Sequence, residues 1–481
     1  MPFGSARREQ EFRKTMRADA LQGGDASGRI AGRTEVVVTK RTLIKCGCLI
    51  TMAPGSREAS AGNILVEGGK IVDAGPRIDA PDAEVIDAGD MIVLPGFVDT
   101  HRHTWQTCVR HRCVNIHPPV AYFEEMMFRR GPRYRPEDVW IANYLGALGA
   151  IDSGVTTMLD WSQIQNTPEH SDAAVDALRQ SGIRGVFGHG WSLTQTGSRT
   201  PNSSRPHPAD IARLRREQFA SDDSLLTLVM AARGPEITDG ETWKADLRLA
   251  RELGIRSSIH MGAFAFNGAK RGIAEMDKYG MLGEDLTFVH CSCSSDDELQ
   301  MVADNGVTVS LGVNVEMNSP GMGDIPFDRL LARGVRPSLS GDTETLGSAD
   351  MFTQMRSALA YYRSYVGGGH SREARAPETL TTHDVLQFAT VEGARANGLL
   401  HKVGTIEPGK FADIIMIRSG DINLMPVIDP VAAIVSGCHP GNVDTVMVEG
   451  RVLKKDGRLL GVDLADVRER AKASQDYVLA D

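Results

Sequence analysis

The middle of the chain alternates short β-branched runs with longer amphipathic segments, from about residue 95 to residue 401. The runs include 155–160, 183–189, 225–230, 256–260, 286–290, 307–311 and 337–342. Repetition of this kind is typical of parallel strands joined by helices. We therefore predict an α/β fold, a (β/α)8 barrel of the TIM type, with its chemistry at the C-terminal ends of the strands. A doubly wound sheet is the alternative, although the glycine-rich phosphate turn usual in that fold is not found.

Strand-like patterns also occur near both ends of the chain. The N-terminal ones are 36–39, 43–48 and a hairpin at 64–72 that turns at Gly68-Gly69, and the C-terminal ones are 412–417 and a hairpin at 443–453 that turns at Glu449-Gly450. A few strands at either terminus cannot bury an apolar face alone, so we expect one composite β-sandwich built from both ends. The predicted organisation is a disordered tail over 1–35, half of the sandwich over 36–94, the barrel over 95–403, and the other half with a tail over 404–481.

Charge and cysteine content exclude several classes of protein. A net charge of −9 without a long Lys/Arg block argues against a nucleic-acid partner, though not against a small heterocycle. No apolar run reaches the roughly 20 residues of a membrane span. Seven cysteines, including Cys46-x-Cys48 and Cys291-x-Cys293, match neither a disulfide framework nor a zinc knuckle. We expect a reduced, cytoplasmic homo-oligomer that acts on a small molecule and has no membrane partner.

Histidines and one aspartate end the predicted strands. His101 and His103 follow the apolar run 91–98 with one residue between them, so on a strand both side chains face the same way and can bind one ion. Such a pair alone is common by chance. Further predicted strands end at His189, His260, His290 and Asp342. Strand ends share one mouth in a barrel, and imidazoles with one carboxylate suit zinc or iron.

A series of motifs, in order along the chain, resembles the amidohydrolase superfamily. They are Pro95-Gly-Phe-Val-Asp-Thr-His-Arg-His103, Ser257-Ser-Ile-His260, Phe288-Val-His290-Cys291, Leu339-Ser-Gly-Asp342, Gly404-Thr-Ile-Glu-Pro-Gly-Lys-Phe-Ala-Asp413 and Val443-Asp-Thr-Val-Met-Val-Glu-Gly-Arg451. The nearest branch holds cytosine and guanine deaminases and triazine hydrolases such as atrazine chlorohydrolase. The resemblance runs from about residue 36 to residue 460.

The resemblance implies a metal site and a reaction. One divalent ion, zinc first and iron, cobalt or manganese as alternatives, would be bound by four residues: His101, His103, His260 and Asp342. His290 would position the attacking water, and Asp342 would pass its proton to the leaving nitrogen. Some relatives bridge two metals with a carboxylated lysine at the fourth strand. We assign that strand to 184–190, which has no lysine, so a single metal is expected.

The chain departs from the branch at its proton shuttle. Deaminases of this branch read His-x-x-Glu at the fifth strand, whereas this chain reads His260-Met-Gly-Ala263. A histidine-containing turn after the seventh strand is also absent, since 310–320 holds none. A general acid–base step contributes roughly 10²–10⁴-fold, so another residue must supply it or the reaction differs.

We predict a metal-dependent hydrolase of a non-peptide C–N bond, in which water attacks an sp² carbon of an aminoheterocycle, as in a deaminase. A hydrolase of amides, ureas or (thio)carbamates is the alternative. An inactive metal-binding scaffold and a metal-independent binding module are two further alternatives. The residues expected to contact substrate are Trp105, Gln106, Asp160, His189, Asn314, Glu316 and Glu344. Each of them also has an interpretation as a packed or loop-capping side chain.

Overall fold

The computed structural model describes residues 41–56, 59–116, 120–194, 202–319, 321–371, 373, 376–377 and 379–480. The predicted tail over 1–35 and the strand at 36–39 lie outside these residues. The described residues belong to one compact unit, and the domain boundaries drawn from the sequence stay a prediction. Among the described residues, no helix is both long and apolar enough to cross a membrane.

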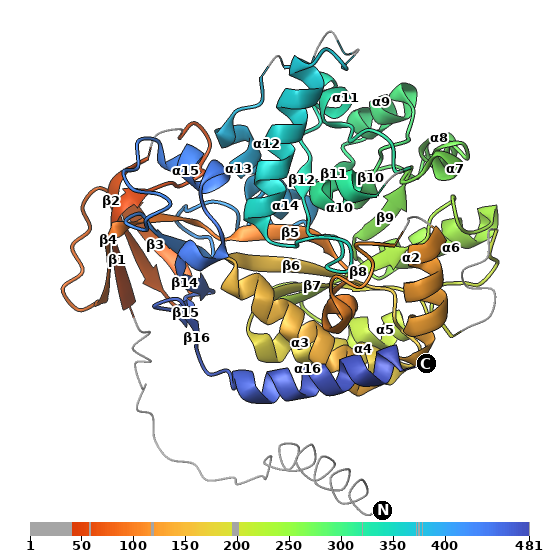
Figure 1. Cartoon of the computed structure of the whole chain (residues 1–481), viewed down its shortest axis with the longest axis horizontal. Helices are drawn as coiled ribbons and strands as arrows, with labels where there is room; N and C mark the ends of the chain where they lie inside the picture. Colours follow the sequence, from red (N-terminus) through yellow and green to blue (C-terminus); the bar gives the residue numbers. More distant parts are fainter. Residues whose placement is uncertain are drawn as a thin grey trace, which may run out of the picture. The chain divides into compact units, whose positions relative to one another are not determined.

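Eight parallel strands form the barrel sheet, and they follow one another in chain order (Figure 1). They are β5 (Phe97–Arg102), β6 (Val155–Ser162), β7 (Arg184–His189), β8 (Leu226–Ala232), β9 (Ser257–Met261), β10 (Leu286–His290), β11 (Thr308–Leu311) and β12 (Ser338–Leu339). The ring closes at its C-terminal end, where the amide of Asp342 donates to the carbonyl of His101 at 2.8 Å and the amide of His103 donates to the carbonyl of Asp342 at 2.7 Å. The predicted barrel is confirmed, and the doubly wound alternative is wrong.

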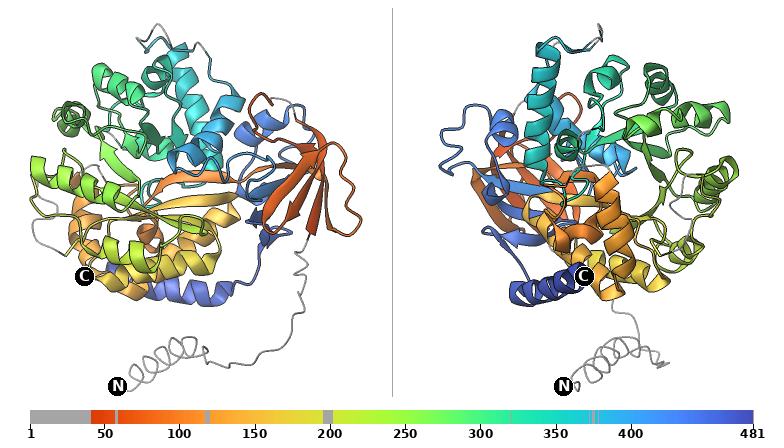
Figure 2. Two further views of the ribbon diagram at one scale, coloured as in Figure 1. Left: turned by 180° about the vertical axis from the view of Figure 1, so that it is seen from behind. Right: turned by 45° about the vertical axis from the view of Figure 1, so that its right-hand side comes forward.

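Helices connect the strands and cover the outside of the barrel (Figures 1 and 2). The longer ones are α3 (Pro136–Asp152), α4 (Pro168–Ser181), α5 (Asp210–Glu217), α6 (Gly240–Glu252), α9 (Asp296–Asp304) and α12 (Met351–Gly367). The shorter ones include η1 (Thr104–Val109), α2 (Val120–Tyr122), η2 (Phe123–Arg130), η3 (Gly131–Arg133), α7 (Ala265–Gly268), α8 (Gly272–Lys278), α10 (Val313–Asn318), α11 (Phe327–Ala332), α13 (Thr382–Phe388) and α14 (Val391–Ala396). Asp239 and Asp350 begin α6 and α12 by accepting a hydrogen bond from an orphan amide of the first turn.

Strands from both ends of the chain form a second sheet, in the order β16-β15-β14-β13-β4-β1-β2-β3. These are β1 (Arg41–Leu49), β2 (Ser60–Glu67), β3 (Lys70–Gly75), β4 (Glu84–Pro95), β13 (Ile414–Arg418), β14 (Val443–Val448), β15 (Arg451–Lys455) and β16 (Arg458–Leu459). Ile44, Val93 and Met416 share its apolar core. The composite β unit is therefore confirmed as one continuous sheet.

The two hairpin turns predicted from the sequence have positive-φ glycines, as expected. Gly68 and Gly69 have φ of +56° and +80°, and Gly450 has φ of +73°. Glycine adopts these values without the steric cost that a Cβ brings. The α15 helix (Pro430–Ser436) and the 3-10 turn η4 (Pro440–Asn442) connect β13 to β14.

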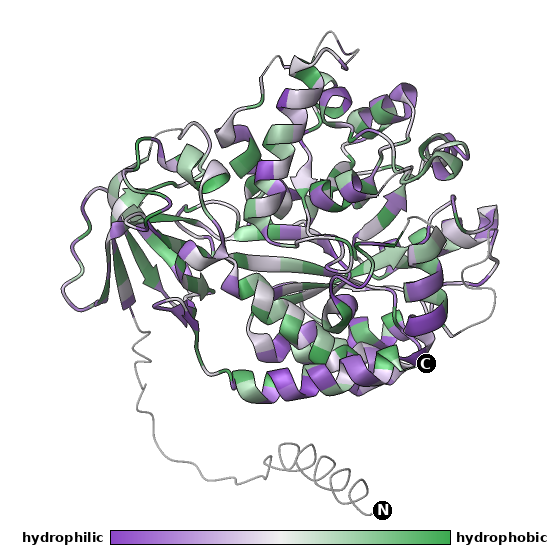
Figure 3. Ribbon diagram, viewed as in Figure 1, coloured by the Kyte–Doolittle hydropathy of each residue, from purple (hydrophilic) through white to green (hydrophobic). Residues whose placement is uncertain are grey.

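The last element was not expected from the sequence. Residues 464–479, predicted as a tail, form the helix α16 (Leu464–Leu479). It packs against α3 and η1, with Val467 and Val478 buried (Figure 2). Arg130 donates to the carbonyls of Val478 and Ala480 at 3.2 and 3.1 Å. Hydrophilic residues are exposed along α16, among them Asp466, Glu469 and Lys472, and much of this helix has the hydrophilic colour in Figure 3.

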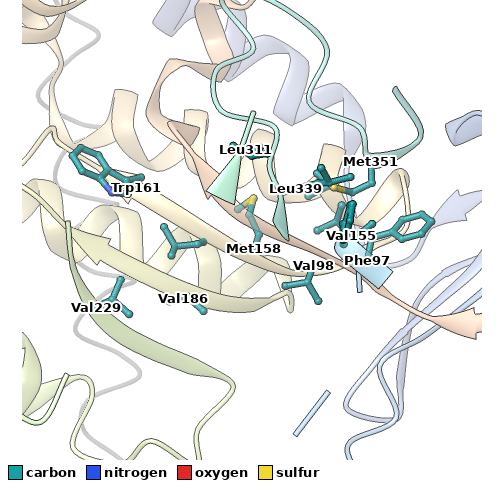
Figure 4. Packing of buried hydrophobic residues seen from close by; sticks show 14 of the residues in the cluster. Phe97, Val98, Val155, Met158, Trp161, Val186, Val229, Leu311, Leu339 and Met351 are labelled. Carbon is teal, nitrogen blue, oxygen red and sulfur yellow. The ribbon is translucent and has the colours of Figure 1, made fainter. Parts of the chain in front are cut away.

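A large buried apolar cluster packs the barrel strands and the helices around them. Val98, Met158, Val186, Leu311 and Leu339 come from different strands and belong to it (Figure 4). At the start of β7 the guanidinium of Arg184 donates two hydrogen bonds to Asp413, at 2.9 and 3.1 Å, and so joins the barrel to the terminal sheet. All seven cysteines lie among the described residues and are free thiols.

Candidate active site

Three histidines and one aspartate converge at the mouth of the barrel. His101 lies at the end of β5 with His103 directly after it, His260 lies in β9, and Asp342 follows β12. Ligand atoms of the three histidines lie within 4.8 Å of one another. His101 Nε2 and His103 Nε2 are 3.2 Å apart, and Asp342 Oδ1 lies 3.5 Å from each. Tetrahedral ligands bound about 2.0–2.1 Å from an ion are about 3.3 Å apart, so this donor set fits one divalent ion.

Hydrogen bonds behind the cluster orient the rings. His103 Nδ1 donates to the amide oxygen of Gln163 at 2.8 Å, with the carbonyl of Trp161 also within reach at 3.1 Å. Because both partners are acceptors, Nδ1 carries the hydrogen and the lone pair of Nε2 stays available to a metal. The indole of Trp161 packs edge-on against His260, with ring centroids 4.3 Å apart.

The charge states of the cluster also suit a cation. Burial lowers the pKa of His101 to about 3 and holds the pKa of His260 well below its usual value. Burial opposes ionisation of Asp342, yet the hydrogen bond with His101 and the neighbouring histidines lower its pKa to about 2. At neutral pH the cluster therefore offers neutral imidazoles and a carboxylate, as divalent zinc or iron requires.

Two site residues have a backbone conformation that favours glycine. His290 has φ of +77° and Asp342 has φ of +52°. Such residues cost of order 1–3 kcal/mol each and persist where the surroundings hold them. Asp342 is held by the two backbone hydrogen bonds that close the barrel. The strain therefore lies where the sequence predicts chemistry.

His290 is oriented by a buried glutamate. Its Nδ1 donates to Glu316 Oε1 at 2.9 Å, and the same oxygen accepts from the amide of Gly312 at 3.1 Å. Burial would lower the pKa of His290, but the bond to Glu316 and the charge of Asp342 raise it above its ordinary value. Glu316, expected to contact substrate, instead fixes the ring that lies next to Asp342.

A cavity of about 540 Å³ opens onto this cluster. His103, His260, His290 and Asp342 line its inner end. Aromatic and apolar side chains form most of the wall: Tyr122, Phe123, Met127, Phe128, Trp161, Trp191, Ile237, Phe264, Phe266 and Leu346. The polar exceptions include Gln163, Glu236, Asn267, Lys270 and Thr343. A cavity of this size and composition suits a small planar ligand with a few polar groups.

Two predicted substrate residues stand one layer behind the cavity. Trp105 donates to Gln163 Oε1 at 3.1 Å, and Gln106 donates to the hydroxyl of Tyr122 at 2.9 Å. Both are fully buried and absent from the lining residues. Their contacts hold the wall in place.

Four more residues that were predicted to contact substrate bond to other protein groups instead. Asp160 accepts from Asn143 at 2.7 Å, and His189 Nδ1 lies 2.9 Å from His207 Nε2. Asn314 Oδ1 accepts from the amide of Ser348 at 3.2 Å. Glu344 accepts from Thr107 and Arg110 at 2.8 and 3.3 Å. None of the four lines the cavity, so substrate contact for these residues stays a prediction that the geometry does not favour.

Sequence reasoning missed several lining residues. Trp161 and Gln163 lie one and three residues beyond the predicted strand 155–160, so the rule that places chemistry at strand ends could have found them. Glu236 lies four residues beyond β8, on a loop without a motif. The strand count also needs a correction. Residues 184–189 form the third barrel strand and not the fourth, which is β8, and β8 too has no lysine.

Comparison with known proteins agrees with this geometry. The family model described as "Amidohydrolase family" matches residues 92–453, about three quarters of the chain. The family match, together with the barrel and its histidine–aspartate mouth, defines a metal-dependent hydrolase of carbon–nitrogen bonds other than peptide bonds. The chain belongs to the amidohydrolase family, as its motifs predict.

Curated relatives match over most of their length. The chain is 28% identical over 429 residues to 5-methylthioadenosine/S-adenosylhomocysteine deaminase of Desulfitobacterium hafniense (strain Y51), which covers 85% of this chain and 94% of that protein. It is 26% identical over 448 residues to 5'-deoxyadenosine deaminase of Methanosarcina mazei, with 91% and 98% covered.

Solved structures share the fold. An adenosine deaminase from Xanthomonas campestris with bound zinc superposes with a TM-score of 0.79 at 20% identity, over 91% of this chain and 98% of that one. Atrazine chlorohydrolase from Arthrobacter aurescens TC1, complexed with zinc, gives 0.78 at 20% identity, over 90% and 100%. The predicted likeness to this branch is confirmed.

Proposed function

We propose that this protein hydrolytically deaminates a planar aminoheterocycle, with adenine nucleosides as the first substrate class to test. The observation that carries the proposal is the aromatic-walled cavity that ends on His290, Asp342 and the histidine cluster. Trp161, Trp191 and Phe264 offer ring faces and edges against which a flat base can pack. Relatives named for deamination of adenosine derivatives support the choice of base.

The proposal includes one divalent ion per chain, with zinc as the first candidate. His101, His103, His260 and Asp342 would hold it, because their donor atoms lie together and are correctly charged. A bound ion of this kind lowers the pKa of water from 15.7 to roughly 7 and so supplies a nucleophile at neutral pH. The absence of lysine from β8 supports a single ion.

The chain's own residues would then move protons and exclude water. Asp342 is ionised at neutral pH and can accept a proton from the oxygen that attacks the sp² carbon, then give it to the leaving amino group. His290 keeps Nδ1 engaged with Glu316, so its Nε2 is the nitrogen available to the attacking oxygen. The apolar wall keeps bulk water from the reacting carbon.

An ammonia assay with the zinc-loaded protein tests the proposal. Adenosine, 5'-deoxyadenosine, 5'-methylthioadenosine, guanine, cytosine and an aminotriazine form the panel. We expect ammonia from at least one of them, and loss of that release in Asp342→Asn. Circular dichroism of the variant separates lost chemistry from lost folding. Ammonia from none of the panel would overturn the proposal.

Ala263 favours one second candidate. Without a glutamate at this position, the chain suits a reaction in which no ring nitrogen has to be protonated, such as release of an amine from a urea or carbamate. Amine release from an arylurea or carbamate, with no ammonia from the heterocycle panel, would select this second function.

The predicted homo-oligomer is part of the same proposal. Three exposed apolar side chains on one short segment support it: Ile422, Met425 and Ile428 are 88%, 56% and 96% exposed. Apolar side chains gathered on a surface are more typical of an interface than of a free face. Light scattering should give a multiple of 52.1 kDa, and a smaller mass for Ile428→Asp. A wild-type monomer would contradict it.

A further inference from the structure

A carboxylate from a different strand stands beside the position where the shuttle glutamate is missing. Glu236 lies on the loop after β8, and its side chain lines the cavity although the residue is only 4% exposed. Its Oε1 accepts from the amide of Gly262 at 2.8 Å. Gly262 directly precedes Ala263, which also lines the cavity. The carboxyl group therefore occupies the neighbourhood that a glutamate at position 263 would reach.

The surrounding backbone leaves room for this side chain. A Cβ at Gly272 would lie 2.8 Å from Glu236 Cγ and 3.1 Å from its Oε1, so a larger residue there would displace the Glu236 side chain. Lys270 donates from its ammonium to the carbonyl of Glu236 and fixes the loop from the other side. Three separate segments, the β8 loop, the turn after β9 and the start of α8, thus converge on one carboxylate.

The environment keeps the pKa of the Glu236 carboxyl group close to neutral pH. Burial raises the pKa of Glu236 to about 7. Glu298 adds to the rise, whereas the Gly262 amide, Lys270 and His290 oppose it. A group whose pKa is close to the working pH accepts and releases a proton with similar ease. The neighbouring buried carboxylate of Glu298 has a structural role. It accepts hydrogen bonds from the amide and the hydroxyl of Ser295 at the start of α9.

We propose that Glu236 is a catalytic residue that carries a proton from the attacking water to the ring nitrogen next to the reacting carbon. It would do this in place of the glutamate absent from position 263. The inference rests on the proposed deamination.

The step balances in protons and electrons. The water oxygen forms a bond to carbon while its first proton passes to a Glu236 oxygen, and the C=N electron pair moves to the ring nitrogen. Glu236 then gives that proton to the ring nitrogen and is a carboxylate again. The second proton passes through Asp342 to the amino group. The C–N bond breaks with its electron pair on nitrogen, and an oxo-heterocycle and ammonia leave.

Glu236→Gln is the first variant, because the amide keeps the acceptor for Gly262 and loses the exchangeable proton. We expect kcat to fall by roughly 10²–10⁴-fold. We expect KM, metal content by mass spectrometry and the Kd of the oxo-heterocycle product each to stay within about threefold of wild type, because binding does not need the exchangeable proton. Glu392→Gln is the matched control, because Glu392 is a buried glutamate of α14 that bonds to Arg395 and does not line the cavity, so its loss should leave kcat unchanged.

A second-site variant separates proton transfer from structural support. In the Glu236→Gln background, Ala263→Glu returns a carboxylate to the same part of the cavity, and we expect it to restore kcat at least tenfold. Wild-type kcat in Glu236→Gln, loss of its metal or product binding, or no recovery in the double variant would overturn the assignment. Ammonia release by the wild type is read independently, so failure of the proposed deamination is distinguished from failure of Glu236.

Discussion

Two buried polar sites at opposite ends of the barrel differ in how their groups are bonded: the histidine–aspartate cluster at the mouth and the Arg184–Asp413 pair at the bottom. At the mouth, within the described residues, His101 Nδ1 and Glu316 Oε2 are buried without a hydrogen-bond partner. His290 and Asp342 have left-handed backbones there. At the bottom, Arg184 is bound to Asp413 through two hydrogen bonds, and Asp413 also accepts from the amide of Glu449 at 2.9 Å.

This contrast separates reactivity from stability within one fold. Unsatisfied groups and strained backbone at the mouth cost folding free energy and leave donor atoms ready for a ligand. The bottom carries a satisfied ion pair that joins the barrel to the terminal sheet, with the guanidinium also 4.6 Å from the ring of Phe411. Variants at the mouth should therefore change chemistry, and variants at the bottom should change stability.

The largest effect is expected at the mouth. His101→Ala removes a donor whose Nε2 lies 3.2 Å from that of His103. We expect the bound metal to fall from one per chain to less than about a tenth, and turnover to fall by more than roughly 10⁴-fold, since the activated water is lost. Metal analysis and the ammonia assay measure both. The exposed His401→Ala is the control. Two metals per wild-type chain, or metal retained in the variant, would refute the ligand set.

The next effect is expected at the bottom. Asp413→Ala leaves the buried guanidinium of Arg184 without its partner. The free energy of unfolding should fall by about 3–5 kcal/mol, as for other buried pairs with one partner removed. Metal content and kcat of the folded protein should not change. Urea unfolding measures the difference. Asp222→Ala, which breaks an exposed pair with Arg215, should cost less than about 1 kcal/mol. Equal losses of unfolding free energy in Asp413→Ala and Asp222→Ala would contradict the expected difference between the buried and the exposed ion pair.

A milder effect is expected from the residue behind His290. Glu316→Gln keeps an oxygen for Nδ1 and loses the negative charge that raises the pKa of the ring. Partners of this type contribute about 10–100-fold to activity or metal affinity. We expect a fall in kcat/KM of that size, without loss of stability in urea. Glu407→Gln, in the terminal region, is the control. A stability loss as large as that of Asp413→Ala would show that the mouth also supports the fold.

The smallest expected effect is on the folding stability at acidic pH. Burial lowers the pKa of His207 well below its ordinary 6.5, and the charge of Arg233 adds to this. The unfolded chain therefore takes up a proton that the folded protein does not. The stability that this group contributes is present above about pH 6.5 and is lost as the pH falls further.

His207→Gln removes that titration and keeps an amide that can bond to His189. Between pH 7 and pH 5 the variant should lose about 2 kcal/mol less stability than wild type. Asp246, which accepts from the His207 amide, and Asp210, which lies 3.7 Å from His189 Nε2, are present in both proteins. Parallel losses in urea unfolding at the two pH values would contradict the assignment.

Local sequence determined the barrel and the candidate ligands. Period-two and amphipathic patterns are properties of neighbouring residues, and a parallel strand that ends in His101, His260 or Asp342 can deliver that side chain only to the mouth. The hairpin turns at Gly68 and Gly450 follow for the same reason, since the positive φ is a demand of one or two residues.

Tertiary structure alone decided which loop side chains face the cavity. Trp105 and Gln106 lie on the expected loop, but their bonds to Gln163 and Tyr122 turn them away from it. Glu236 reaches the amide of Gly262 although 26 residues separate them, and α16 finds its place only because α3 and η1 offer a surface. Along a regular strand, sequence spacing determines which way each side chain points. In a loop it does not, because packing against distant residues sets the backbone angles.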